Sequence, residues 1–115
     1  MNEEVIVILI TAPTVEDGAR IARTLVEERL AACVNLVPQV ASTFRWEGAV
    51  QTENEAILVV KTQAALFDSL AARVRALHPY TVPEILAIPI LAGNQAYLDW
   101  IQDSVGPAGL SPKTP

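Results

Sequence analysis

The chain has few of the residues that build covalent frameworks and metal sites. Among 115 residues there is one cysteine, Cys33, and one histidine, His78. A single cysteine excludes an internal disulfide, so the stability must come from packing and a reducing compartment is compatible with the chain. One cysteine and one histidine per chain also exclude a structural zinc site of four thiolates, or of two thiolates and two imidazoles.

Positive charge and long apolar runs are scarce as well. Eight Lys and Arg residues stand against thirteen Asp and Glu residues, which gives a net charge of −5 and argues against nucleic acid as a partner. The longest aliphatic run, Val5–Ile10, is much shorter than the roughly 20 residues of a membrane-spanning helix. The start, Met-Asn-Glu-Glu, is acidic where a secretory signal is basic. We therefore expect a cytoplasmic protein with no membrane partner.

Catalytic signatures are missing too. The sequence contains no P-loop, no Gly-x-Gly-x-x-Gly after a strand, no His-Glu-x-x-His and no Gly-x-Ser-x-Gly. A catalytic serine would have to share His78 as its base, because no other histidine exists. We expect no enzymatic activity.

The hydrophobic pattern predicts a single α+β domain. Its order is strand, helix, strand, strand, helix, strand and a terminal helix, which is the ferredoxin-like split βαβ sandwich with a C-terminal helix. The expected elements are strand Val5–Ile10, a helix capped by Thr14 and running to Leu30, strands 31–37 and 42–46 with the turn Glu47-Gly48, strand 55–62, helix 66–77, strand 85–91 and a helix capped by Asn94. The domain spans residues 1–103, and the Pro/Gly-rich tail 104–115 is expected to be disordered.

Several strands are apolar on both faces, although the two central helices of this plan cover only one face. In the first strand, Val5, Val7 and Leu9 alternate with three isoleucines. An open apolar sheet face of several hundred Å² is rare on a soluble monomer, so other copies of the chain should cover it.

Cys33 and His78 are the candidate metal ligands. Cys33 lies in a strand of small and apolar residues, where a free cysteine usually behaves as a buried hydrophobe. His78 lies in a polar loop framed by prolines, with Tyr80 and Glu84 close in sequence. Imidazole is a common ligand of Cu²⁺ and Zn²⁺, but a hydrogen-bonding role within the loop is equally open.

Lys61 is the candidate cation of a polar pocket. It shares a strand face with Ile57 and Val59, so its ammonium group requires a carboxylate, and Glu84 at the start of the fourth strand is the natural partner. The two residues could form an ion pair at an interface or part of a pocket for a small anion or metal. The large amphipathic rings of Trp46 and Tyr80 suit interface packing. The acidic stretch 53–55 offers hard ligands but is more typical of a solvated turn.

Six segments, in order, closely resemble the CutA divalent-cation-tolerance family. They are Thr11-Ala12-Pro13, Leu30 to Asn35, Phe44-Arg45-Trp46-Glu47-Gly48, Val60-Lys61-Thr62, His78 to Ile85 and Tyr97 to Ile101. The resemblance covers nearly the whole chain, from about Val5 to Asp103.

The resemblance implies a ferredoxin-like protomer in a tight homotrimer whose sheets interlock edge to edge, similar in architecture to the PII signalling proteins. It also implies a role in tolerance of divalent cations, copper above all, with Cu²⁺ or another divalent cation as the bound metal and no established reaction. In family members credited with copper ligands, a cysteine and a second histidine stand where this chain has Ile10 and Leu77. Only His78 matches that ligand set, so the site is weaker, uses Cys33 or Glu84 instead, or is not the function of this member.

The family's polar residues near subunit interfaces carry over onto Lys61, Glu84, Tyr80 and Trp46. Two further functions stay open. The chain could be a PII-like sensor that binds a small anionic metabolite between subunits through Lys61 and Arg45, or a purely structural scaffold.

Light scattering tests the homo-oligomer expected from the two-sided strands. We expect the particle mass to be at least twice the 12.4 kDa mass of one chain. A 12.4 kDa particle would contradict it.

Overall fold

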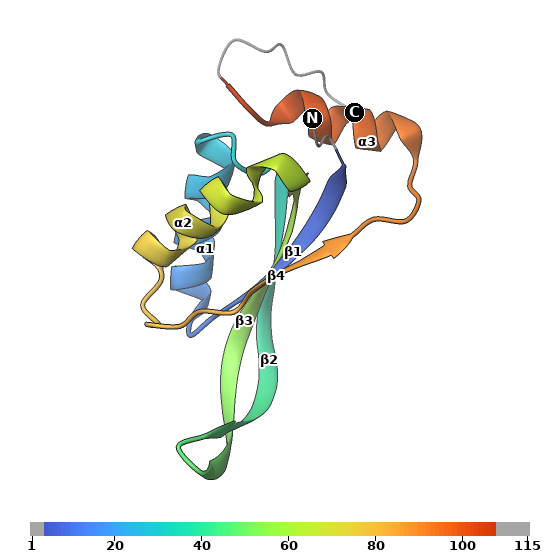
Figure 1. Ribbon diagram of the computed structural model, residues 1–115. Coiled ribbons are helices and arrows are strands. Elements are labelled where there is room, and N and C mark those ends of the chain that lie inside the picture. Colours follow the sequence, from blue (N-terminus) through green and yellow to red (C-terminus); the bar gives the residue numbers. More distant parts are fainter. Residues whose placement is uncertain (1–3, 108–115) are drawn as a thin grey trace.

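The computed structural model describes residues 4–107, which form one antiparallel sheet with helices on both of its sides (Figure 1). The elements are β1 Val5–Ala12, α1 Val15–Glu27, β2 Cys33–Trp46, β3 Ala49–Gln63, the 3₁₀ turn Ala64–Leu66, α2 Phe67–Leu77, β4 Ile85–Pro89 and α3 Gln95–Ser104. The strand order is β2-β3-β1-β4, and every neighbouring pair is antiparallel. This confirms the predicted ferredoxin-like α+β plan.

The predicted helix starts are confirmed by their caps. The Thr14 hydroxyl accepts a hydrogen bond from the Asp17 amide, and the Asn94 side chain accepts one from the Ala96 amide. The expected end of α1 at Leu30 is wrong, because Arg29 adopts a positive φ of 61°. The Leu30 amide then bonds back to the Leu25 carbonyl, which closes the helix at Glu27.

Strands β2 and β3 form one long ribbon that extends beyond the rest of the sheet (Figure 1). The expected end of the strand at residue 37, just before Pro38, is wrong: β2 runs through Pro38 because it is an edge strand, where a missing amide hydrogen is tolerated. A β-bulge between Val37 and Val40 shifts the register of β2 against β3 next to this proline. The ribbon turns at Glu47 and Gly48, whose φ angles of 50° and 81° make the predicted tight turn.

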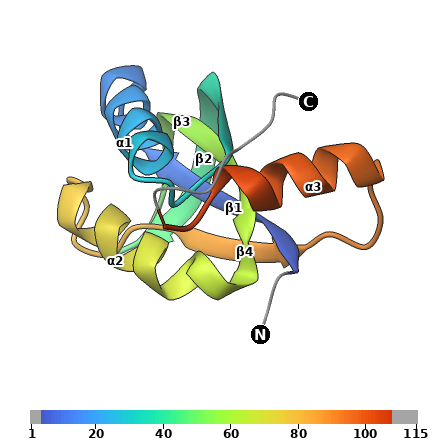
Figure 2. The ribbon, with the colours of Figure 1, turned by 90° about the horizontal axis from the view of Figure 1, so that it is seen from above.

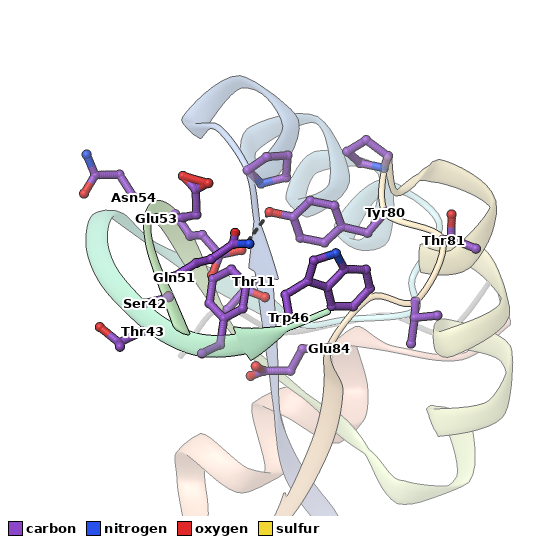
Figure 3. Close-up of a pocket in the computed structure, with 15 residues that line it drawn as sticks. Thr11, Ser42, Thr43, Trp46, Gln51, Glu53, Asn54, Tyr80, Thr81 and Glu84 are labelled. Atoms are coloured by element: carbon purple, nitrogen blue, oxygen red, sulfur yellow. Dashed lines mark hydrogen bonds between the residues drawn. The ribbon is translucent and has the colours of Figure 1, made fainter. Parts of the chain in front are cut away.

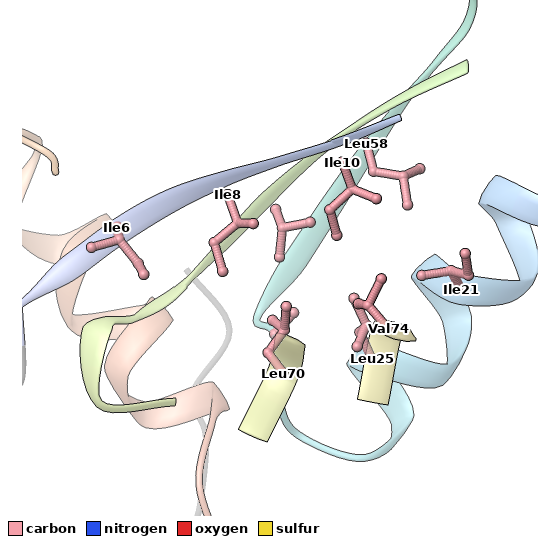
Figure 4. Close-up of a cluster of buried hydrophobic side chains, with 10 residues drawn as sticks. Ile6, Ile8, Ile10, Ile21, Leu25, Leu58, Leu70 and Val74 are labelled. Atoms are coloured by element: carbon pink, nitrogen blue, oxygen red, sulfur yellow. The ribbon is translucent and has the colours of Figure 1, made fainter. Parts of the chain in front are cut away.

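The main core lies between the sheet and helices α1 and α2 (Figure 4). Alternate residues of β1 point into it, and Ile8 and Ile10 have no exposed surface. Leu25 of α1 and Leu70 of α2 meet them from the helical layer, as the predicted apolar stripes require.

Helix α3 packs on the other side of the sheet, at one end (Figure 2). Val5, Ile101 and Val105 form a second buried cluster there. The packed part of the chain therefore continues past residue 103, and Arg29 donates to the carbonyls of Asp103 and Gly106. The rest of the predicted tail, 108–115, lies outside the described residues.

Apart from α3, no element between residues 4 and 107 covers the second face of the sheet. Val37, Leu86 and Ile88 are 40%, 57% and 45% exposed. The register places Leu86 opposite Leu9 and Ile88 opposite Val7, so these side chains form one apolar stripe. We call it the open face; its apolar members are Val7, Leu9, Val37, Ile57, Val59, Leu86 and Ile88. None of the helices between residues 4 and 107 has the length and hydropathy of a membrane span.

Replacing Ile8 with alanine tests the main core. Because Ile8 is fully buried, the cavity should lower the free energy of unfolding by about 3 kcal/mol. Urea denaturation measures this, with Val82→Ala as the control, since Val82 is 79% exposed and should cost under about 0.5 kcal/mol. A loss for Ile8→Ala as small as that of the control would contradict this core.

Candidate functional site

A hollow of about 990 Å³ lies where the long β2–β3 ribbon leaves the body of the sheet (Figure 3). The ribbon forms one wall, and the loop between α2 and β4 forms the other. The lining residues are Thr11, Pro13, Ser42, Thr43, Phe44, Trp46, Gln51, Glu53, Asn54, Glu55, Pro79, Tyr80, Thr81, Val82 and Glu84.

The hollow is lined by carboxylates and aromatic rings. Its acidic side chains are Glu53, Glu55 and Glu84, and its lining contains no Lys, Arg or His. Because side chains alternate along a strand, Glu53 and Glu55 lie on the same side of β3 as Ile57 and Val59. The expectation of a solvated turn at 53–55 is therefore wrong, because these residues lie inside β3 and pair with β2.

Tyr80 connects the loop wall to the ribbon wall. Its hydroxyl donates a 2.8 Å hydrogen bond to Oε2 of Glu55. Partial burial, together with this carboxylate, raises the pKa of Tyr80 to about 12. Tyr80 and Trp46, both named from the sequence as pocket residues, line the hollow together (Figure 3).

The His78 ring contacts the Tyr80 ring, with 4.9 Å between the ring centroids, and His78 is not part of the lining of the hollow. Its Nδ1 accepts a hydrogen bond from the Tyr80 amide at 3.0 Å, and its Nε2 lies 2.6 Å from the Thr11 carbonyl oxygen. Since a carbonyl only accepts, this contact is a hydrogen bond when Nε2 carries a proton. Both nitrogens are engaged and the residue is 8% exposed, so a metal could bind the ring only after one of these bonds had opened.

Cys33 lies at the other end of the open face, beside α3. It is half-buried, and its Sγ is 4.0 Å from Oδ1 of Asn35. Burial raises the pKa of Tyr97, and the electrostatic and hydrogen-bonding interaction with Cys33 raises it further. Cys33 pairs with Lys61 of β3, which in turn pairs with Val7 of β1. His78 instead contacts Thr11, at the other end of β1. These β1 positions are separated by about 13 Å along the strand, so one chain does not bring the two predicted ligands together.

Lys61 does not meet Glu84 within the chain. Its ammonium group donates to Oδ1 of Asn35, and no ion pair joins it to Glu84 among the residues from 4 to 107. Arg45 pairs with Val50 near the tip of the ribbon, about 40 Å along β2 from the position opposite Lys61. An anion pocket that uses both Lys61 and Arg45 therefore stays a prediction that requires two copies.

Three of the residues predicted for a pocket between subunits, Trp46, Tyr80 and Glu84, line this hollow, whereas Lys61 and Arg45 do not. Glu53 and Glu55 also line it, although the sequence-based prediction did not include them. The available signal was the alternation of these two glutamates in phase with Ile57 and Val59, which predicts one continuous strand.

Alkaline titration of the tyrosine absorbance tests the contact between Tyr80 and Glu55. Because the pKa of Tyr80 is higher in the folded protein, the stability that the protonated Tyr80 hydroxyl contributes is fully present below pH 10. It is lost as the pH rises through about 12. We expect the ionisation near pH 12 to be missing in Tyr80→Phe, which leaves Tyr97 as the control signal. An ionisation of Tyr80 near pH 10 would contradict the contact.

Comparison with known proteins identifies relatives over nearly the whole chain. The family model described as "CutA1 divalent ion tolerance protein" matches residues 6–104. The chain is 55% identical over 100 residues to the divalent-cation tolerance protein CutA of Thermus thermophilus, with 87% of this chain and 97% of that protein covered. It is 48% identical over 99 residues to the chloroplastic protein CutA 1 of Oryza sativa, covering 86% of this chain and 56% of that protein.

Solved structures show the same fold. The divalent cation tolerance protein of Thermus thermophilus superposes with a TM-score of 0.87 at 54% identity, covering 89% of this chain and 99% of that one. CutA1 of Oryza sativa gives a TM-score of 0.89 at 45% identity, covering 91% and 96%. The matching family model, the close relatives and the shared fold show that this chain belongs to the CutA1 divalent ion tolerance family.

Proposed function

We propose that this protein takes part in the response to divalent metal ions as a homotrimer that binds a divalent cation. The observation that carries the proposal is the hollow, which is lined by Glu53, Glu55 and Glu84 and has no cationic side chain in its lining. Carboxylate oxygens attract divalent cations, and the excess of negative charge favours them over an anionic metabolite. The relatives' names, which speak of tolerance to divalent cations, support the same function.

The donor atoms of one chain do not make a complete copper site. Copper and zinc prefer imidazole and thiolate, yet both nitrogens of His78 are engaged and Cys33 lies elsewhere. No three His, Cys, Asp or Glu side chains in the described part of the chain converge on one point. Metal binding through His78 or Cys33 therefore stays a proposal that needs either a second copy or an opened His78 loop.

The open face supports assembly into an oligomer. Leu86 and Ile88 expose about half of their surface beside Val7 and Leu9, in a stripe that a second copy could cover. The number three comes from the family resemblance.

Calorimetric titration with Cu²⁺, Zn²⁺ and Ca²⁺ tests the proposed metal binding. We expect saturable binding by the native protein, with Cu²⁺ tried first, and a loss of affinity of about tenfold or more in Glu84→Gln. The control is Glu16→Gln, which removes the same charge from the exposed side of α1 and should leave the affinity within about twofold.

A His78→Ala variant, checked for its melting temperature, separates the two possible sites. Binding that is lost only in this variant would place the metal at the His78 loop instead of the hollow. Equal weak heats in all four proteins would refute metal binding as the function.

A further inference from the structure

Two charged groups on the same side of the sheet have no oppositely charged partner among residues 4–107. Lys61 lies on the side of β3 that carries Ile57 and Val59, and in the described part of the chain its ammonium group bonds to the neutral amide of Asn35 and to no carboxylate. Glu84 lines the hollow and, within residues 4–107, makes no ion pair and no side-chain hydrogen bond.

The register keeps these two groups apart. Lys61 pairs with Val7 on one side of β1, while Glu84 precedes Ile85, which pairs with Ile10 on the other side. Glu84 therefore lies level with Thr11, about 13 Å along β1 from Val7 and on a strand across from Lys61. That separation exceeds the reach of a lysine side chain, so the two residues cannot pair within one copy.

The apolar stripe lies between these two groups. If a second copy covers the open face, Lys61 at one end and the hollow at the other end lose water together. A buried charge without a counter-charge is costly, whereas a lysine paired with a carboxylate is tolerated. A second copy that covers the open face must therefore also provide an oppositely charged partner for Lys61 and for Glu84.

We propose that Lys61 of one copy enters the hollow of another copy and pairs there with Glu84, so that each hollow is completed by its neighbour. The inference rests on the proposed homo-oligomer. Glu84 is preferred over Glu55 because the Glu55 carboxylate already accepts the Tyr80 hydroxyl. The rings of Trp46 and Tyr80 in the same lining suit an ammonium group, which is attracted to aromatic faces. One ammonium group against three carboxylates leaves the hollow negative, which is compatible with a divalent cation beside it.

Charge reversal tests the pair in metal-free buffer with a chelator, so that the result does not depend on metal binding. We expect Lys61→Glu and Glu84→Lys each to weaken assembly about a hundredfold or more, measured by light scattering over a dilution series. The double variant Lys61→Glu, Glu84→Lys should recover most of this loss. The control Arg75→Glu reverses an exposed charge on α2, behind the other face, and should assemble like the native protein.

Mixing the two single variants separates contact between copies from contact within one copy. A pair across copies predicts that Lys61→Glu and Glu84→Lys chains, tagged differently, form mixed oligomers in preference to pure ones. A pair within one copy predicts no preference, because each chain would keep its own like charges. Random mixing, or a double variant as weak as the single variants, would overturn the proposal.

A disulfide gives a direct reading of the contact. In a Cys33→Ser background, mild oxidation of a mixture of Lys61→Cys and Glu84→Cys chains should produce a linked dimer of the two chains. Replacing the second partner with Glu16→Cys on α1 should produce none. An intact oligomer without the linked dimer refutes the pair, while a native protein that is monomeric throughout refutes the homo-oligomer itself.

Discussion

The two-sided apolar character of β1 is the constraint on which the rest of the structure depends. Its even-numbered isoleucines fill the core under α1 and α2, and its odd-numbered residues Val7 and Leu9 form the centre of the open face. Each side therefore needs a cover. Within residues 4–107, α1 and α2 cover one side, and the other side is covered only at the end where α3 packs on Val5. A strand with this composition exposes an apolar face that is large for a soluble monomer, and this exposure motivates the proposed homo-oligomer.

The hollow follows from the same sheet. The pairing of β1 with β3 ends at Ala12 and Ala56, so the part of the ribbon from Glu55 to the turn has no third strand beside it. Side chains of this part face the loop that carries Tyr80. Carboxylates occur where the ribbon leaves the body, and hydrophobic residues occur where the sheet is complete. The carboxylates of the hollow and the apolar stripe thus occupy successive sections of one strand surface.

His78 has a clear structural role in this arrangement. Its ring accepts from one backbone amide and lies within hydrogen-bonding distance of a carbonyl of β1, and so it holds the start of the loop against the sheet. Tyr80, two residues later, reaches Glu55 from that anchored position. A buried polar ring with both nitrogens engaged satisfies the rule that buried polar groups are hydrogen-bonded. The sequence left a loop role and a metal role open for this histidine, and the geometry describes the first without testing the second.

The sequence by itself determined the layers of the fold, the caps at Thr14 and Asn94, the two-sided strands and the family. These depend on local periodicity, on short-range cap chemistry and on motifs that are written in consecutive residues. Only the tertiary structure decided that β2 continues through Pro38, that Arg29 ends α1 early, and that Glu53 and Glu55 share a hollow with Tyr80 and Glu84.

Those features depend on strand order, register and contacts between residues far apart in the chain. Pro38 is tolerated because β2 is an edge strand, and the distance between Lys61 and Glu84 follows from their positions on opposite sides of β1. Local patterns specify which face a side chain occupies along its own strand. They do not specify which other strand lies beside it, because pairing is set by the packing of the whole domain.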